Sequence, residues 1–149
     1  YEIGLSLAGS EMCIRDRNSA LTFFILISGI SAGAILFQSF IVASSIFKVL
    51  PEENAGLLLR NLFPKFFLFL AALALVGLAI GLVNGLKFFP LVFLQLLNFI
   101  FFVVCYSLIP ATNRARDQEN KKTFGILHTV SVLLTLLALI FNLSLVFLI

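Results

Sequence analysis

The chain has 149 residues, of which 61% are hydrophobic and only 11% are charged, and its mean hydropathy is +1.14. A domain this apolar would expose too little polar surface to stay dispersed in water, which excludes a soluble globular protein. The net charge of +3 is small and spread over several segments. The chain therefore lacks the basic surface of a nucleic-acid-binding protein, and no nucleic-acid partner is expected.

The first seventeen residues differ from the rest and resemble translated sequencing-adapter read-through. The resemblance is closest in GSEMCIRDR at residues 9–17, which contains the only methionine of the chain, Met12. We therefore expect residues 1–17 to be a non-native tail and exclude them from the fold. The alternative is a genuine N-terminal tail. Because no linker divides the remainder, residues 18–149 are expected to form one domain.

Four apolar stretches without Asp, Glu, Lys or Arg fill most of this domain. They cover residues 19–47, 66–86, 88–109 and 124–149. A bilayer core about 30 Å thick needs roughly 20 helical residues, and each stretch is long enough. A charged residue at the centre of such a helix would cost roughly 2.5–3.5 kcal/mol to insert. The sequence therefore predicts an all-α integral membrane protein, a bundle of four transmembrane helices in a lipid bilayer.

Between the first two stretches, residues 51–63 carry the signals of a separate helix. Pro51, Glu52 and Glu53 are typical of a helix start. Apolar residues then follow at helical spacing, at Leu58, Leu59, Leu62 and Phe63. The pattern predicts a short helix in the membrane interface, where Arg60 would approach lipid phosphates. Alternatively, this helix simply redirects the chain.

Lysine and proline residues mark the ends of the middle spans. Lys65 and Lys87 enclose the second span, and both can extend their ammonium groups toward lipid headgroups. Pro90 suits the first turn of the third span, and Pro110 suits its end. Only a tight hairpin can then connect the second span to the third.

Basic residues are concentrated in two connecting segments, residues 48–65 and 110–123. These segments hold Lys48, Arg60, Lys65, Arg114, Arg116, Lys121 and Lys122. The opposite face holds Lys87, together with Arg15 and Arg17 of the tail. Because lysine and arginine in short loops favour the cytoplasm, we expect both basic segments to be cytoplasmic and both termini to lie on the other side.

Small residues form a stripe on each of the first two spans. In the second span they recur every three or four positions, at Ala74, Gly77, Gly81 and Gly85. The first span has Gly29 and Gly33 at the same spacing. Such stripes allow two helix backbones to approach closely, so we expect the first two spans to be mutual partners.

Polar side chains form a stripe on three of the spans, and they should face the inside of the bundle because they avoid lipid. Span one contributes Ser28, Ser31, Gln38 and Ser45, span three Gln95, Asn98 and Cys105, and span four His128, Ser131, Thr135 and Asn142. Hydrogen bonds between such residues average about 0.6 kcal/mol and commonly act as structural glue. Alternatively, the stripes line a pathway.

No enzymatic or metal site is expected. His128 is the only side chain inside a span that normally titrates near neutral pH. We expect it to be a hydrogen-bonded structural residue; the alternative is that its protonation switches a contact. Ser131 lies on the same helix, but no carboxylate inside a span could orient an imidazole base, so no catalytic residue is assigned. The two cysteines, Cys13 and Cys105, lack metal-ligand spacing, and no cofactor-binding motif occurs.

Two groups of motifs resemble a known family. The first group consists of SFIVASSIFKVLP at residues 39–51, Ala55-Gly56, and LFPKFF at residues 62–67. The second group consists of NRARD at residues 113–117 and FGILHTVS at residues 124–131. In their order and in the four-span layout they resemble the transmembrane-protein-205-like family, also called domain of unknown function 4149. The resemblance implies a four-span helical membrane domain and brings no established reaction or substrate. The chain departs from the family pattern at Thr129 and Thr135, where glycine and asparagine are usual.

The resemblance singles out a set of residues, most of them on the predicted cytoplasmic face. They are Phe47, Pro51, Gly56, Phe63, Pro64, Asn113, Arg114, Arg116, Asp117, His128 and Ser131. Their physical interpretation is a rigid rim, in which Asn113 and Asp117 cap turns and the arginines contact phosphates or the acidic pair at 52–53. This rim either fixes the two connecting segments or binds a ligand.

The working hypothesis is a non-enzymatic membrane protein that contributes to small-solute transport or membrane trafficking. Its basis is the set of polar stripes beneath a basic rim. The competing hypothesis, suggested by the glycine stripe of the second span, is a structural or assembly module that packs against another membrane protein. Four spans enclose only a narrow path, so transport is expected to need a homo-oligomer.

Overall fold

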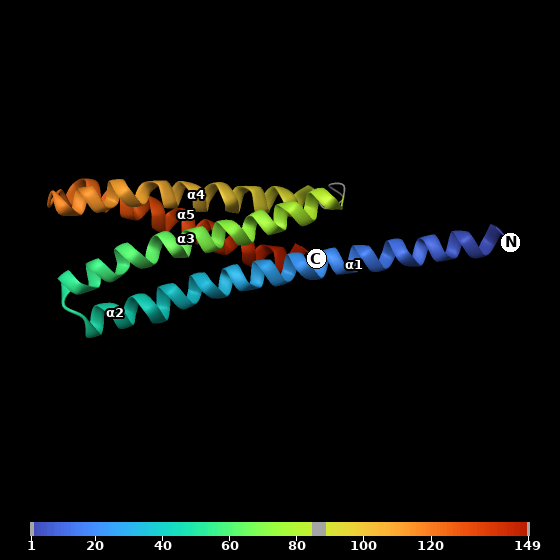
Figure 1. The fold of residues 1–149 in the computed structure, drawn as a ribbon, viewed down its shortest axis with the longest axis horizontal. Helices are drawn as coiled ribbons and strands as arrows, with labels where there is room; N and C mark the ends of the chain where they lie inside the picture. Colours follow the sequence, from blue (N-terminus) through green and yellow to red (C-terminus); the bar gives the residue numbers. More distant parts are fainter. Residues whose placement is uncertain (1, 85–88, 149) are drawn as a thin grey trace.

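The computed structural model describes residues 2–84 and 89–148, with side chains for residues 19–84 and 89–145 (Figure 1). Every element in this part of the chain is helical, and no strand occurs in it. The elements are α1 (Glu2–Leu36), the π-helix η1 (Phe37–Val42), α2 (Ala43–Val49), α3 (Glu52–Val83), α4 (Phe89–Asp117) and α5 (Lys121–Leu148). The predicted all-helical fold is confirmed.

Within the described residues, four helical segments are long and apolar enough to cross a bilayer. They are Ser19–Val49, Glu52–Val83, Phe89–Asp117 and Lys121–Leu145. The chain is therefore an integral multi-pass membrane protein, as the sequence predicts. The helices are longer than the apolar stretches, since the 32 residues of α3 span about 48 Å. Their charged ends consequently extend beyond the hydrocarbon layer.

No separate interfacial helix precedes the second span. Residues 51–63 are mostly helical, as expected, but α3 begins at Glu52 and continues through Pro64 without a break. Proline removes one backbone hydrogen bond inside a helix. Buried side chains on both sides of it, Leu59 and Phe67, pack into the bundle and hold the two halves of α3 on one axis.

Pro110 likewise does not end the third span. The sequence places it at the end of a helix, yet α4 continues to Asp117. Residues beyond the proline are anchored to α3, since Ala115 is 4% exposed and Asp117 forms an ion pair with Arg60. Tertiary contacts therefore outweigh the missing backbone hydrogen bond, and the segment between α4 and α5 shortens to residues 118–120.

That short connection is a helix-ending turn. The N–H of Asn120 donates to the carbonyl of Ala115 at 2.9 Å, and the N–H of Glu119 donates to the carbonyl of Arg116 at 3.0 Å. Glu119 has a φ of 53°, the left-handed conformation that this turn requires and that glycine usually supplies. Asn120 then caps α5, because its Oδ1 accepts the N–H of Thr123 at 3.1 Å.

The glycine stripe of α3 packs against α4. Gly81 lies so close to α4 that a Cβ there would come within 2.3 Å of Val92 Cγ2, and a Cβ at Gly77 would lie 3.0 Å from Gln95. Gly29 and Gly33 on α1 have nothing within 4 Å of such a Cβ. The expected pairing of the first two spans through their glycines is therefore corrected.

The hairpin explains why α4 is the partner. It places α3 and α4 side by side along their length, and they form the most extensive pair in the bundle (Figure 1). α5 packs against α4 and α1, while α1 contacts α3 less. Ala74 extends the glycine stripe and is buried. Gly85 and Lys87, which belong to the connection, lie outside the described residues.

Buried apolar residues form three cores along the bundle. The hairpin-side core is Phe24, Leu91, Val92 and Leu145. The central core is Ile35, Phe67, Leu70, Ala71, Ala74, Phe102, Cys105 and Ala138. The rim-side core is Ile46, Ala55 and Leu59.

Candidate functional site

A layer of buried polar side chains lies inside the bundle. It consists of Ser28 and Ser31 of α1, Gln95 and Asn98 of α4, and Asn142 of α5, and each of them is at most 3% exposed. We call these residues the polar layer. The sequence predicts that all of them face inward, and the structure brings them from three helices into the same region.

The polar layer lies between two apolar cores. On α1 it is flanked by Phe24 of the hairpin-side core and Ile35 of the central core. The flanking pairs on the other helices are Val92 with Phe102 on α4, and Leu145 with Ala138 on α5. Because three helices give the same order, the layer is a polar zone closed by apolar side chains on both sides.

Part of the polar layer is internally hydrogen-bonded. Gln95 Nε2 donates to Ser28 Oγ at 3.2 Å and joins α4 to α1. The aliphatic part of Gln95 lies against Gly77, where a side chain would displace it. Asn142 Nδ2 donates to the carbonyl of Ala138 at 2.8 Å, so one end of this amide is held by its own helix.

Other amide atoms in the layer have no partner. Neither Nδ2 nor Oδ1 of Asn98 has a hydrogen-bond partner among the described residues, and neither does Asn142 Oδ1. A buried polar group left in this state costs about 1–3 kcal/mol. These atoms can therefore bind a hydrogen-bonding molecule that enters the bundle.

Gln38 lies outside the polar layer, beyond the end of α1 and closer to Lys48 of α2. It is 8% exposed, and its Nε2 also has no partner in the described part of the chain. The residue belongs to the π-helix η1, in which the N–H of Ala43 donates to the Gln38 carbonyl. Ser44 Oγ donates to the carbonyls of Phe40 and Ile41, which stabilises this widened turn. The sequence predicts that Gln38 points inward, but it carries no pattern that indicates the π-helix.

The stripe of span four is only partly internal. Asn142 is buried and Ser131 and Thr135 are half-buried, whereas His128 is exposed and stacks on Phe124 with ring centroids 5.8 Å apart. Ser131 Oγ and Thr135 Oγ1 donate to carbonyls of α5 itself, at 3.1 and 2.7 Å. His128 therefore lies on the outer surface of the bundle and does not join the polar layer.

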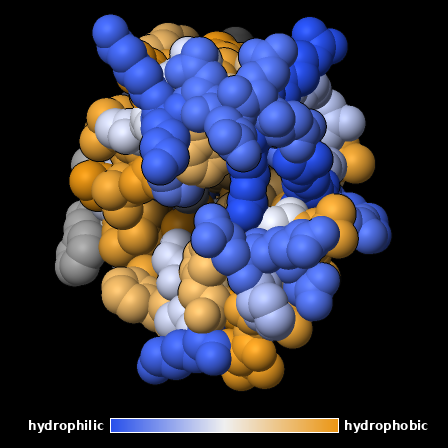
Figure 2. All heavy atoms as spheres, turned by 90° about the vertical axis from the view of Figure 1, so that its left-hand side faces the viewer, coloured by the Kyte–Doolittle hydropathy of each residue, from blue (hydrophilic) through white to orange (hydrophobic). Residues whose placement is uncertain are grey.

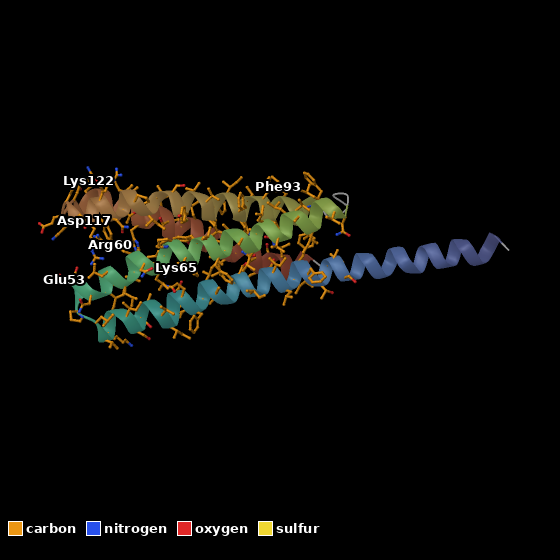
Figure 3. The ribbon with its side chains drawn as sticks, in the orientation of Figure 1. Glu53, Arg60, Lys65, Phe93, Asp117 and Lys122 are labelled. Atoms are coloured by element: carbon orange, nitrogen blue, oxygen red, sulfur yellow. The ribbon has the colours of Figure 1, made fainter. Side chains whose placement is uncertain are left out.

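The basic residues of the two connecting segments, 48–65 and 110–123, lie at one end of the molecule, as the sequence predicts. Figure 2 shows a hydrophilic surface at this end. We call this end the basic rim. Its residues are Lys48, Arg60, Lys65, Arg114, Arg116, Lys121 and Lys122, with Arg60, Lys65 and Lys122 labelled in Figure 3. The two basic segments therefore lie at the same end of the bundle.

Two arginines of the rim join α3 to α4. Arg60 on α3 forms an ion pair with Asp117 at the end of α4 (Figure 3). Arg116 Nη2 donates to the carbonyl of Glu52 at 3.3 Å and lies 3.9 Å from its Oε1. Its guanidinium covers Gly56, where a Cβ would come within 2.7 Å of Nη1. A residue larger than glycine at this position would displace Arg116.

These contacts support the predicted rim and correct one of its details. The expected approach of arginine to the acidic pair is confirmed for Arg116 and Glu52. Asp117 pairs with Arg60 across two helices, and the cap of the following helix comes from Asn120. No local sequence pattern indicates the Arg60–Asp117 pair, because the two residues are 57 positions apart.

The bundle also has an apolar groove of about 450 Å³ on its surface, between α3 and α4. It is lined by Leu75, Leu78, Ala79, Leu82, Phe89, Val92, Phe93 and Leu96. Phe89 and Phe93 stack at 6.3 Å along one side. With no polar lining atom, this groove suits an acyl chain of the bilayer and offers nothing to a polar solute.

A comparison with protein families finds one matching family model, described as a domain of unknown function (DUF4149), over residues 26–121. The matched segment includes Gly56, the polar residues of α4 and the rim residues up to Lys121, and it ends before His128. No curated protein and no solved structure matches the chain.

Proposed function

We propose a function for this chain, which belongs to the DUF4149 family, a family described only as a domain of unknown function. In this proposal the protein contributes to the transport of a small solute across its membrane and catalyses no reaction. The observation that carries the proposal is the buried, unpartnered amide of Asn98 in the polar layer.

A role in holding two helices together by a hydrogen bond does not account for the Asn98 amide. A polar side chain that joins two helices gains its stability from a hydrogen bond between them, as Gln95 does with Ser28. Asn98 is equally buried but makes no such bond among the described residues. In a membrane, polar residues inside a bundle mark the paths of solutes and ions. A solute that bonds to Asn98 would offset the cost of burying it.

The two flanking cores would act as gates in this proposal. Phe24 and Leu145 close the polar layer toward the α3–α4 hairpin, and Phe102 closes it toward the basic rim. A solute would reach the layer when one core opens and leave it when the other opens, as in transporters that bind near the middle of the membrane. The arrangement described above is then the closed form.

The orientation is also part of the proposal. All the basic residues of the rim lie at one end of the bundle (Figure 2). Because positively charged loops are retained in the cytoplasm, this end would be cytoplasmic and both termini would lie on the opposite side. The finer family assignment, to transmembrane-protein-205-like proteins, rests on the motifs at residues 39–51, 113–117 and 124–131.

The proposal is tested by thiol labelling of the polar layer. Cys105 is replaced by alanine, and a single cysteine is placed at Asn142 in a chain that begins near Asn18 and is reconstituted into vesicles. The matched control is Leu143→Cys, because Leu143 is the neighbouring residue of α5 and is exposed toward lipid. We expect a small membrane-impermeant reagent to label position 142 and not position 143. Protection of both positions from both sides would contradict transport.

A second candidate function, an assembly module, is favoured by one observation. Gly29 and Gly33 lie on the exposed face of α1 and have open space around them, although their spacing suits close helix packing. A second copy of the chain or another membrane protein would pack there. Replacing both glycines with leucine should then abolish a cross-linked oligomer, while Gly125→Leu, at an exposed glycine of α5, should preserve it. Equal cross-linking in both variants would exclude this interface.

A further inference from the structure

We infer that the solute is small, uncharged and able both to donate and to accept hydrogen bonds, in the size range from water to urea. This inference rests on the proposed function, because it takes the polar layer as the place where the solute binds. It is carried by the hydrogen-bonding capacity, the charge and the packing of the layer.

The unpartnered hydrogen-bonding groups of the layer are one donor group and two acceptors. Gln95 Nε2 is committed to Ser28, and Asn142 Nδ2 to a carbonyl of α5. The Nδ2 donor of Asn98 and the Oδ1 acceptors of Asn98 and Asn142 remain. A molecule that only donates or only accepts would leave part of this set unpaired, whereas water, urea or a small alcohol can satisfy both kinds.

The lack of charge in the layer favours a neutral ligand over an ion. The buried polar residues of the described chain are serine, glutamine and asparagine, with no ionised side chain among them. Asp117, the acidic residue of α4, is 19 positions beyond Asn98, or about 28 Å along the helix. An ion taken into the bundle would lose its hydration without meeting an opposite charge. A neutral solute avoids this cost.

The packing of the layer limits the size of the solute. Its residues are at most 3% exposed, and Gln95 is held against the backbone of α3 at Gly77. Apolar cores close the layer on both sides. In a layer packed this closely, a molecule of a few heavy atoms would displace fewer side chains than a sugar or a lipid headgroup would.

The first experiment measures water at Asn98. The chain is labelled with ¹⁵N-asparagine, placed in lipid bilayers and measured by water-edited solid-state NMR, in which side-chain amides in contact with water gain signal. The Asn98 signal is identified by its loss in Asn98→Leu, and exposed Asn120 of the rim is the positive control. We expect Asn98 to gain signal. A dry Asn98 beside a hydrated Asn120 would overturn the inference, whatever the vesicles show.

The second experiment measures permeability of vesicles that contain the chain, using urea and potassium ions as probes. We expect urea to pass and potassium to be retained. Asn98→Leu, which keeps the branched outline and removes both polar atoms, should lower the protein-dependent urea flux about fivefold or more. Asn142→Leu is the second variant, should the first fail to fold. Ser107→Ala is the control, since Ser107 is exposed and bonds only to its own helix, at Val103.

The outcomes separate this inference from the proposed function. Potassium flux without urea flux would overturn the neutral-solute class and leave transport standing. Vesicles that pass neither urea, water nor ions above the protein-free level would overturn transport itself. A urea flux that is unchanged in folded Asn98→Leu would place the path outside the polar layer and overturn the inference.

Discussion

Single residues at the basic rim act through close contacts that their own chemistry permits. Arg116 can lie across α3 only because Gly56 has no side chain beneath its guanidinium. From there it reaches the Glu52 carbonyl and neutralises part of the acidic first turn of α3. A flexible arginine and a glycine, 60 positions apart, thus hold the start of one span against the end of another.

Glu119 provides the clearest residue-scale prediction. Its φ of 53° is costly for a residue with a Cβ, whereas glycine adopts it readily. We expect Glu119→Gly to raise the free energy of unfolding by roughly 0.5–1 kcal/mol. The measurement is unfolding in mixed micelles, followed by circular dichroism. The control is Gln118→Gly, which adds backbone freedom without relieving a left-handed residue and should not stabilise. A destabilised Glu119→Gly would contradict this account of the turn.

At the scale of helices, the glycines of α3 set the distance to α4. A glycine stripe indicates that a close partner exists but does not say which helix it is. The hairpin brings α4 alongside α3 in antiparallel register, so Gly77 meets Gln95 and Gly81 meets Val92. Gly29 and Gly33 remain on the outer face of α1. The glycine pattern of α3 therefore correctly predicted that another helix packs closely against it, but the predicted partner, the first span, was wrong.

The contact between Gly81 and Val92 leads to an element-scale prediction. An alanine Cβ at position 81 would meet Val92 Cγ2 at 2.3 Å, so either the Val92 side chain or the two helices must move. We expect Gly81→Ala to lower the free energy of unfolding by about 1–3 kcal/mol, the usual cost of overpacking. In the double variant with Val92→Ala, the loss should be smaller than the sum of the two single losses. Additive losses would mean that this contact does not limit the distance between the helices.

At the scale of the whole molecule, the bundle is a set of apolar cores with one polar layer between two of them. The first residues of α1 extend away from the other helices (Figure 1). The earliest described residue of α1 in the buried core is Ala20. We therefore predict that the folded bundle does not depend on residues 1–17.

This arrangement predicts the effect of removing residues 1–17. A chain that begins at an initiator methionine before Asn18 should keep the helical content of residues 18–149 and unfold at the same temperature, within the error of the measurement. The control is a chain that begins after Phe24, which loses this residue from the hairpin-side core and should be less stable by several kcal/mol. A large loss of stability in the first deletion would show that the tail is part of the fold.

The amino-acid sequence by itself determined that this protein is a membrane-spanning helical bundle. Hydrocarbon imposes a length and excludes charge, and both requirements act on each segment separately. Local composition was therefore sufficient for the four spans, for the inward direction of Gln95, Asn98 and Asn142, and for the gathering of basic residues at one end.

Only the tertiary structure decided how these segments fit together. It showed that α3 and α4 continue through Pro64 and Pro110, because contacts on both sides of each proline outweigh one lost hydrogen bond. It also selected α4 as the partner of the glycine stripe and left Asn98 without a hydrogen bond to any described residue, beside the paired Gln95. These outcomes depend on the register between helices distant in sequence, which no local pattern encodes.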